Sequence, residues 1–353
     1  MRYPCGTWWN TDTALLRQTH PVRTTIATLV LLLLAPASAG AAPTTERAAP
    51  AGLAVTGYAL PSTHPAIIRR DAAALTTVTV AAVSLRPDGA STTSPDPRTA
   101  RLVGTAHAEG LRAELLVGNW SDRLGGFDPD AASHLLSDGD HITAVADQLT
   151  GLVASGGWDG VNVDLELVRR RDSRGLVAFV TALRERLPAT ASITIDVSAR
   201  TSATAYRAGG YRLAELAAVV DAVQLMAYDQ HGPDWSGPGP IGGLAWVRDA
   251  VAAALAEVPP EKLDLGVAGY GYLWRADGSG RTLTVKAARR LVERSGAAAR
   301  WRRAQGEWRA TLPGRRVVWW SDGRSYAARA ALATDLGLRG TAIWRLGSAG
   351  PLD

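Results

Sequence analysis

The feature that most constrains the fold is a regular alternation of short apolar runs with longer amphipathic stretches from Leu53 onward. Short runs of apolar and β-branched residues are typical of parallel strands buried on both faces, and the Ala- and Arg-rich stretches between them have a helical period. The predicted strands are Leu53–Leu60, Thr76–Leu85, Ala113–Asn119, Gly160–Glu166, Ser192–Ala199, Ala222–Tyr228, Leu263–Tyr270 and Gly340–Leu346. The predicted helices include Arg98–Glu109, Asp140–Ser155, Ser173–Leu187, Leu244–Glu257 and Tyr326–Leu336.

Repeated strand–helix units favour an α/β fold, a closed (β/α)8 TIM barrel, over an open doubly wound sheet, which the pattern alone leaves open. No Gly-x-Gly-x-x-Gly opens the first unit, which argues against dinucleotide binding. Between Trp274 and Val317 the pattern changes to strand, helix and two strands, at Thr282–Val285, Ala287–Ser295, Ala304–Arg309 and Arg316–Trp320. We predict a small α+β insertion between strands 7 and 8, at about residues 275–316, that is either padding or a wall of the cleft at the barrel mouth.

The N-terminal stretch resembles an export signal followed by a tether. Arg17 and Arg23 precede an apolar run, Thr25–Ala35, that is short for a membrane span and leads to small residues that suit signal peptidase. We predict a signal peptide at 1–39, a flexible linker at 40–51 and a catalytic barrel at 52–353, with a retained membrane anchor as the alternative. The protein is then secreted, extracellular or in the cell wall, with no membrane contact after signal removal. Its one cysteine, Cys5, lies in the leader, which suits an oxidising exterior.

Composition and charge limit the partners. With 46% hydrophobic and 20% charged residues, the chain has the composition of an ordinary globular protein. Its formal net charge of +5 comes mostly from dispersed arginines, which are typical of a solvated surface and also suit an anionic polymer such as a cell wall. Zinc-ligand spacings, recognition-helix signatures and RNP-like motifs are absent, so we predict no nucleic-acid partner. The histidines show no metal-ligand spacing, and we predict no metal and no other cofactor.

One predicted strand carries a row of polar side chains. In the segment Trp158–Glu166 (WDGVNVDLE), alternate side chains point to opposite faces. The apolar members share the face that packs under the helices, and Asn162, Asp164 and Glu166 share the face toward the barrel interior. A buried polar row is costly unless it is satisfied or used, and Glu166 lies at the C-terminal end of the strand, where catalytic residues of barrels occur. The alternative is an ion network that only closes the barrel.

The segment Asp159–Glu166 (DGVNVDLE) resembles the DGxDxDxE strand-4 signature of glycoside hydrolase family 18, the chitinase family. Segments similar to strands 6, 7 and 8 of that family follow in order, at Met226–Asp229, Gly266–Gly271 and Gly340–Trp344. Within the family, the chain is most similar to the bacterial branch of spore-cortex and cell-wall hydrolases, through Leu116–Ser121, Tyr228–Gly232 and Gly237–Pro240. The resemblance implies a glycosidase whose partner is a polysaccharide of N-acetylglucosamine-type sugars, peptidoglycan or chitin.

The resemblance also implies retaining, substrate-assisted catalysis. Glu166 is expected to protonate the glycosidic oxygen while the substrate's own 2-acetamido oxygen attacks the anomeric carbon. Asp164 is expected to hydrogen-bond the acetamido N–H, and Tyr228 to donate its hydroxyl to the acetamido carbonyl. Because the acid must be protonated near neutral pH, burial and the neighbouring Asp164 should raise the pKa of Glu166.

A set of sugar contacts follows from the same resemblance. Trp344 is expected to stack beneath the sugar whose bond is cut. The other predicted substrate-binding residues are Asn162, Asp229, Gln224, Met226, Asn119 and Trp120. Asn162 departs from the usual Asp of the family, and because an amide cannot share a proton with Asp164, this change bears on turnover and pH optimum and favours peptidoglycan as the substrate.

Two other functions remain open. A non-catalytic chitinase-like carbohydrate-binding protein is disfavoured by the presence of Glu166 and weakly favoured by Asn162. A small-molecule enzyme on an unrelated barrel should have a phosphate-binding glycine motif after the last strands, and the sequence has none. We therefore predict a secreted, monomeric glycosidase, with endo or exo action left open.

Overall fold

The computed structural model describes residues 52–352, so the predicted signal peptide and linker lie outside the described residues. Eight parallel strands close into a barrel in the order β1, β15, β9, β8, β7, β6, β3 and β2. These strands are β1 (Ala54–Ala59), β2 (Thr77–Ser84), β3 (Arg112–Gly118), β6 (Gly160–Asp164), β7 (Ser192–Ser198), β8 (Ala222–Met226), β9 (Leu263–Ala268) and β15 (Gly340–Trp344). The predicted (β/α)8 barrel is confirmed.

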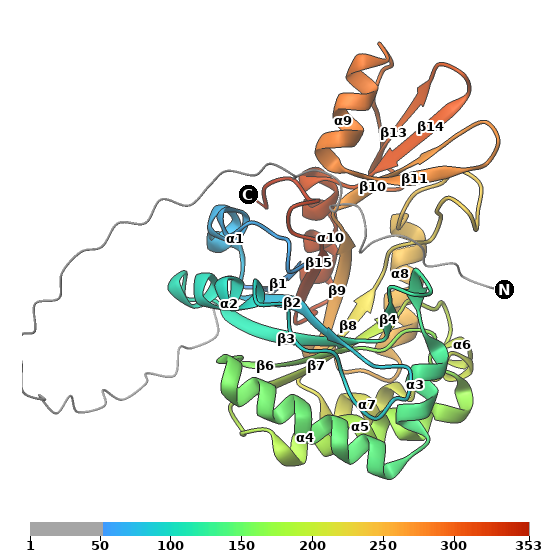
Figure 1. The fold of residues 1–353 in the computed structure, drawn as a ribbon. Coiled ribbons are helices and arrows are strands. Elements are labelled where there is room, and N and C mark those ends of the chain that lie inside the picture. The colour runs from blue at the N-terminus through green and yellow to red at the C-terminus, as the bar shows by residue number, and fades with distance from the viewer. Residues whose placement is uncertain (1–51, 353) are drawn as a thin grey trace, which may run out of the picture.

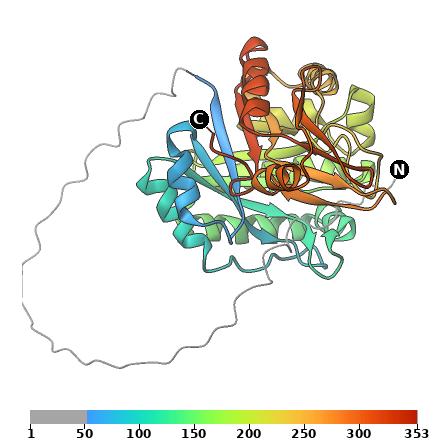
Figure 2. The same cartoon turned by 90° about the horizontal axis from the view of Figure 1, so that it is seen from above.

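Helices surround the barrel (Figures 1 and 2). They are α1 (Pro65–Asp71), α2 (Thr99–Ala108), α3 (Pro129–Leu136), α4 (Gly139–Gly156), α5 (Ser173–Arg186), α6 (Ala203–Ala208), α7 (Leu213–Val219), α8 (Leu244–Leu255) and α10 (Gly323–Asp335). Local sequence sets their ends: the Asp138 side chain accepts from two N–H groups at the start of α4, and Gly157, at a φ of 69°, ends that helix. Within residues 52–352, no helix is both long and apolar enough to cross a membrane.

Strand β6 has the two faces that its alternation predicts. Val161 and Val163 are fully buried in the core between the barrel and the helices. Asn162 is fully buried inside the barrel, where its Nδ2 donates to Thr194 Oγ1 at 2.9 Å and to Asp196 Oδ1 at 3.1 Å. The strand ends at Asp164 rather than at the predicted position two residues later, and the Glu166 N–H donates to the Asn119 side chain instead of to a neighbouring strand.

The insertion between β9 and β15 folds as a separate layer above the barrel mouth (Figure 1). Its five strands, in sheet order, are β11 (Gly280–Thr284), β10 (Tyr270–Trp274), β14 (Arg316–Trp320), β13 (Glu307–Leu312) and β12 (Arg300–Arg302). Helix α9 (Val285–Arg294) contributes to the hydrophobic core of this layer. The predicted α+β insertion is confirmed, but the expected strand Leu263–Tyr270 is wrong at its end, because the chain leaves the barrel at Gly269 and enters the second sheet as β10.

A buried ion pair ties the insertion to the barrel. Glu307 of β13 and Arg329 of α10 lie 2.8 Å apart, with side chains 0% and 2% exposed. Glu307 also accepts from the N–H groups of Ile241 and Gly242, at 2.8 and 2.9 Å. Arg329 donates to the carbonyls of Gly242 and Gly306. The pair therefore fixes the end of the segment between β8 and α8, which borders the barrel mouth.

Candidate active site

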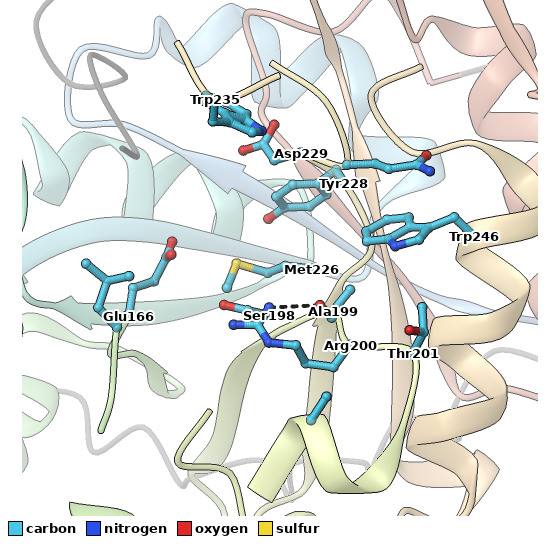
Figure 3. A pocket seen from close by; sticks show the side chains of 13 residues that line it. Glu166, Ser198, Ala199, Arg200, Thr201, Met226, Tyr228, Asp229, Trp235 and Trp246 are labelled. Atoms are coloured by element: carbon cyan, nitrogen blue, oxygen red, sulfur yellow. Dashed lines mark hydrogen bonds between the residues drawn. The ribbon is translucent and has the colours of Figure 1, made fainter. Parts of the chain in front are cut away.

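A pocket opens at the C-terminal ends of β6, β7 and β8, with Glu166 on one side and Tyr228 and Met226 across from it (Figure 3). Its cavity volume is about 270 Å³, near the lower end of the usual range for small-ligand pockets. The lining residues are Glu166, Leu167, Ser198, Ala199, Arg200, Thr201, Ala205, Met226, Tyr228, Asp229, Gln230, Trp235 and Trp246.

Asn119 holds the backbone of Glu166. The Glu166 N–H donates to Asn119 Oδ1 at 2.8 Å, and Asn119 Nδ2 donates to the Glu166 carbonyl at 2.9 Å. The same Nδ2 donates to the Asp128 carbonyl at 2.9 Å. Asn119 is fully buried and both polar atoms of its side chain bind the chain. Its role as a sugar contact stays a prediction, and these contacts lead us to expect that Asn119 positions Glu166.

Replacing Asn119 with alanine should lower kcat much more than it changes KM. The Glu166 backbone loses both contacts to this side chain, and a displacement of about 1 Å at a catalytic group can cost roughly 10²-fold in rate. Steady-state kinetics on a soluble chito-oligosaccharide would measure the split. Unchanged kcat in a variant with a normal unfolding transition would contradict the positioning role.

Burial and neighbouring carboxyl groups raise the pKa values of the acids in the site, but Asp164, which was expected to raise the pKa of Glu166, is not among the groups that do so. Burial is the main cause that raises the pKa of Glu166 to about 8, the nearby Asp229 and Asp196 add to it, and Arg200 opposes it. Burial and the charge of Glu166 likewise hold the pKa of Asp164 well above its ordinary value. Groups this close release protons as a coupled set. The arrangement keeps a proton on Glu166 near neutral pH, as general acid catalysis requires.

Two buried acceptors lie on β6, the strand that leads to Glu166. Asp164 Oδ1 and Asn162 Oδ1 have no hydrogen-bond partner within residues 52–352. A buried polar atom without a partner costs about 1–3 kcal/mol. The barrel end therefore offers acceptor capacity for a donor such as an amide N–H of a ligand.

Tyr228 and Asp229 follow β8 on the other side of the pocket. Burial, with Asp196 nearby, holds the pKa of Tyr228 well above its ordinary value, so its hydroxyl stays a donor. Asp229 Oδ1 accepts from Tyr270 at 2.5 Å and Tyr272 at 2.7 Å. Burial raises the pKa of Asp229 to about 6 although both tyrosines lower it. Because both tyrosines belong to β10, the insertion positions a pocket carboxyl and is more than padding.

The other predicted site residues lie in three places. Met226 lines the pocket, whereas Trp344 is half-buried and tilted against Tyr58, with ring centroids 5.4 Å apart. Gln224 is 1% exposed inside the barrel, in contact with the Tyr58 hydroxyl. Trp120 lines a second hollow beside the end of β2. The predicted set is therefore divided between the pocket wall, the barrel interior and a neighbouring hollow.

Arg200 and Trp246 line the pocket without having been predicted. Arg200 follows β7 outside any recognised motif, and Trp246 stands in the first turn of α8. The only signal in the sequence for Arg200 as a pocket residue is its position directly after the predicted strand Ser192–Ala199. Among residues 52–352, no group of three or more His, Cys, Asp and Glu side chains is placed to hold a metal ion.

A carboxyl with a raised pKa at the mouth of a (β/α)8 barrel, facing a tyrosine hydroxyl across a pocket, is a candidate for general acid catalysis. The sequence model of Glycosyl hydrolases family 18 matches residues 55–349. The chain belongs to this family, and it is a glycosidase.

Individual relatives agree with this assignment. The glycosylase YvbX of Bacillus subtilis is 22% identical over 67% of this chain and 72% of its own length. The cortical fragment-lytic enzyme of the same organism is 29% identical over 55% of this chain, and the match covers only 48% of that relative. The crystal structure of a chitinase from Chromobacterium violaceum superposes with a TM-score of 0.77 at 26% identity, covering 85% of this chain and 96% of that chain.

Proposed function

We propose that this protein is a secreted, monomeric hydrolase that cuts β-linked N-acetylglucosamine-containing polysaccharide, peptidoglycan or chitin, by retaining, substrate-assisted catalysis. The observation that carries the proposal is the Glu166 carboxyl, which faces Tyr228 across the pocket with its pKa raised to about 8. The names of a cortical fragment-lytic relative and of a chitinase structure support the two substrate classes.

In the proposed first step, Glu166 gives its proton to the glycosidic oxygen as the bond to the anomeric carbon breaks. The acetamido oxygen of the same sugar forms a bond to that carbon, which gives an oxazolinium ion. Tyr228 donates to the acetamido oxygen, and Asp164 accepts from the acetamido N–H. An internal nucleophile needs no protein carboxylate in that role, and effective molarities of well-aligned groups reach about 10⁵–10⁸ M.

In the second step, ionised Glu166 takes a proton from water as the water oxygen bonds to the anomeric carbon. The bond from that carbon to the acetamido oxygen breaks, which restores the acetamido group and the original configuration. Trp344 lies partly exposed beside Tyr58, and we assign it to the apolar face of the sugar that is cut. Asp229, fixed by two tyrosines, is assigned to a polar contact with the same sugar.

Product analysis tests this function. Chito-oligosaccharides and purified peptidoglycan glycan strands should both be digested and examined by mass spectrometry, and the anomer released first should be identified by NMR. We expect reducing ends on N-acetylglucosamine units, first released as the β-anomer. Release of the α-anomer would contradict retention, and measurable sugar binding without any product would favour the non-catalytic alternative.

A further inference from the structure

Arg200 is the only basic residue among the thirteen described residues that line the catalytic pocket. It is the second residue after the end of β7. Its Nη1 donates to the Ala199 carbonyl at 2.9 Å. The guanidinium extends across the floor of the pocket toward Glu166 (Figure 3). The bond to Ala199 limits the directions that this long side chain takes.

This cation works against the proton donor. A positive charge near Glu166 favours the ionised carboxylate, and Arg200 lowers the pKa that burial raises. On a neutral sugar, this charge opposes the protonated form of Glu166 that the first step requires, although it stabilises the ionised form in the second step. An anionic group on the substrate would pair with the guanidinium and reduce its lowering of the Glu166 pKa. The place of Arg200 therefore fits an anionic substrate.

The pocket borders the sugar that is cut and extends toward the leaving sugar. Tyr228 and Asp229, assigned to the sugar that is cut, line it together with the proton donor Glu166, whereas Trp344 does not. Leu167, Trp235 and Trp246 give the pocket apolar walls suited to the faces of a sugar ring. In a β-1,4-linked polymer, Glu166 protonates O4 of the leaving sugar. A substituent on the neighbouring C3 of that sugar would extend close to the proton donor, where the guanidinium lies.

We propose that Arg200 binds a carboxylate carried at C3 of the leaving sugar, the free lactyl carboxylate of an N-acetylmuramic acid. The inference rests on the proposed function and narrows its substrate. A guanidinium offers a planar fork of donors that matches both oxygens of a carboxylate. The apolar pocket walls limit solvent screening and strengthen the pair.

The same chemistry predicts which reaction must come before this one. Where a stem peptide is attached to peptidoglycan, the lactyl carboxyl is part of an amide and carries no charge. The preferred substrate is therefore a glycan strand that has lost its peptides. A reaction of the amide-hydrolysing class must act before this enzyme.

A second, basic hollow on neighbouring segments supports an anionic glycan strand as the substrate. Five arginines line it: Arg170, Arg171, Arg174, Arg207 and Arg212. Two glutamates also line it, and Glu257 and Glu215 pair with Arg207 and Arg212, which leaves a net positive charge. The first three arginines are exposed. Repeated carboxylates along a strand would meet this positive field beyond the pocket.

Three matched substrates test the inference: an alternating N-acetylglucosamine and N-acetylmuramic acid oligosaccharide with free lactyl carboxylates, its lactyl amide, and a chito-oligosaccharide of equal length. The enzyme should cleave the free acid with a higher kcat/KM than the amide. Arg200→Gln should lower kcat/KM for the free acid by about 10–100-fold, the range of a charge-assisted hydrogen bond, mainly through KM. The ratio of free acid to amide should then approach one.

Two further variants make the result specific. Arg200→Lys keeps the charge without the fork and should retain more of the preference than Arg200→Gln. Arg248→Gln removes an exposed charge from α8 outside the pocket lining, and it should keep the wild-type preference. Arg200→Gln should also move the alkaline limb of the pH profile upward on all three substrates, because the charge that lowers the Glu166 pKa is gone.

Cleavage of the amide by Arg200→Gln shows that the variant is folded. Equal losses on the free acid and the amide, or no preference in the wild-type enzyme, would overturn the inference and leave the glycosidase function intact. If the wild-type enzyme cut none of the three substrates, the proposed function itself would fail.

Discussion

Glu166→Gln should reduce kcat on N-acetylglucosamine oligosaccharides by about 10²–10⁴-fold, the usual contribution of a general acid. Glutamine has nearly the same shape, so the backbone contacts to Asn119 persist and KM should change little. The lost function is the proton, which neither Tyr228, with its high pKa, nor Asp229 across the pocket replaces. Steady-state kinetics with quantified reducing ends would measure the effect.

A substrate with a different leaving group distinguishes loss of the general acid from loss of the fold. An aryl glycoside with a weakly basic leaving group needs little protonation, so Glu166→Gln should lose far less in its bond-breaking step on this substrate. Glu109→Gln, an exposed change after α2, is the matched control and should behave as wild type. Equal losses on both substrates would mean that Glu166 is structural.

Arg329→Met should lower the free energy of unfolding by about 3–5 kcal/mol, the usual cost of removing one partner from a buried ion pair. The variant leaves the Glu307 carboxyl without its cation and removes a donor from the carbonyls of Gly242 and Gly306. Urea unfolding followed by tryptophan fluorescence would measure the difference. Arg290→Met, an exposed change on α9, should cost little.

The loss of unfolding free energy in Arg329→Met should depend on pH. Burial raises the pKa of Glu307, and Arg329 opposes that rise. Without Arg329, the folded state keeps the Glu307 proton to a higher pH, whereas the unfolded chain releases it near the ordinary carboxyl value. The destabilisation should therefore grow as pH rises above that value and shrink in acid. Adding Glu307→Gln should recover part of the loss at neutral pH, and a fully additive loss would contradict the coupling.

The barrel and the position of Glu166 at its mouth were predictable because their signals are local. Alternation in β6 separates Val161 and Val163 from Asn162, and the structure has the same two faces. The length of each apolar run set each barrel strand to within a few residues. Glu166 was predicted because parity and its position at the strand end agree.

Contacts between distant segments could not be predicted. Asn119 reaches Glu166 across 47 residues, and nothing in its own segment indicates which backbone it binds. The tyrosines that hold Asp229 lie on β10, and the apolar pattern runs through Gly269 without marking the end of β9. Arg200 is one of many dispersed arginines, and only the closed barrel brings it beside Glu166.

The most direct test is the titration of the Glu166 carboxyl in the substrate-free enzyme. Carbon-13 NMR of protein labelled at the glutamate side-chain carboxyl carbons, with Glu166→Gln used to assign the resonance, would follow its protonation with pH. We expect an apparent pKa near 8, matched by the alkaline limb of activity. A Glu166 carboxyl that titrates near 4.5, the ordinary value for a glutamate, would contradict its role as the proton donor.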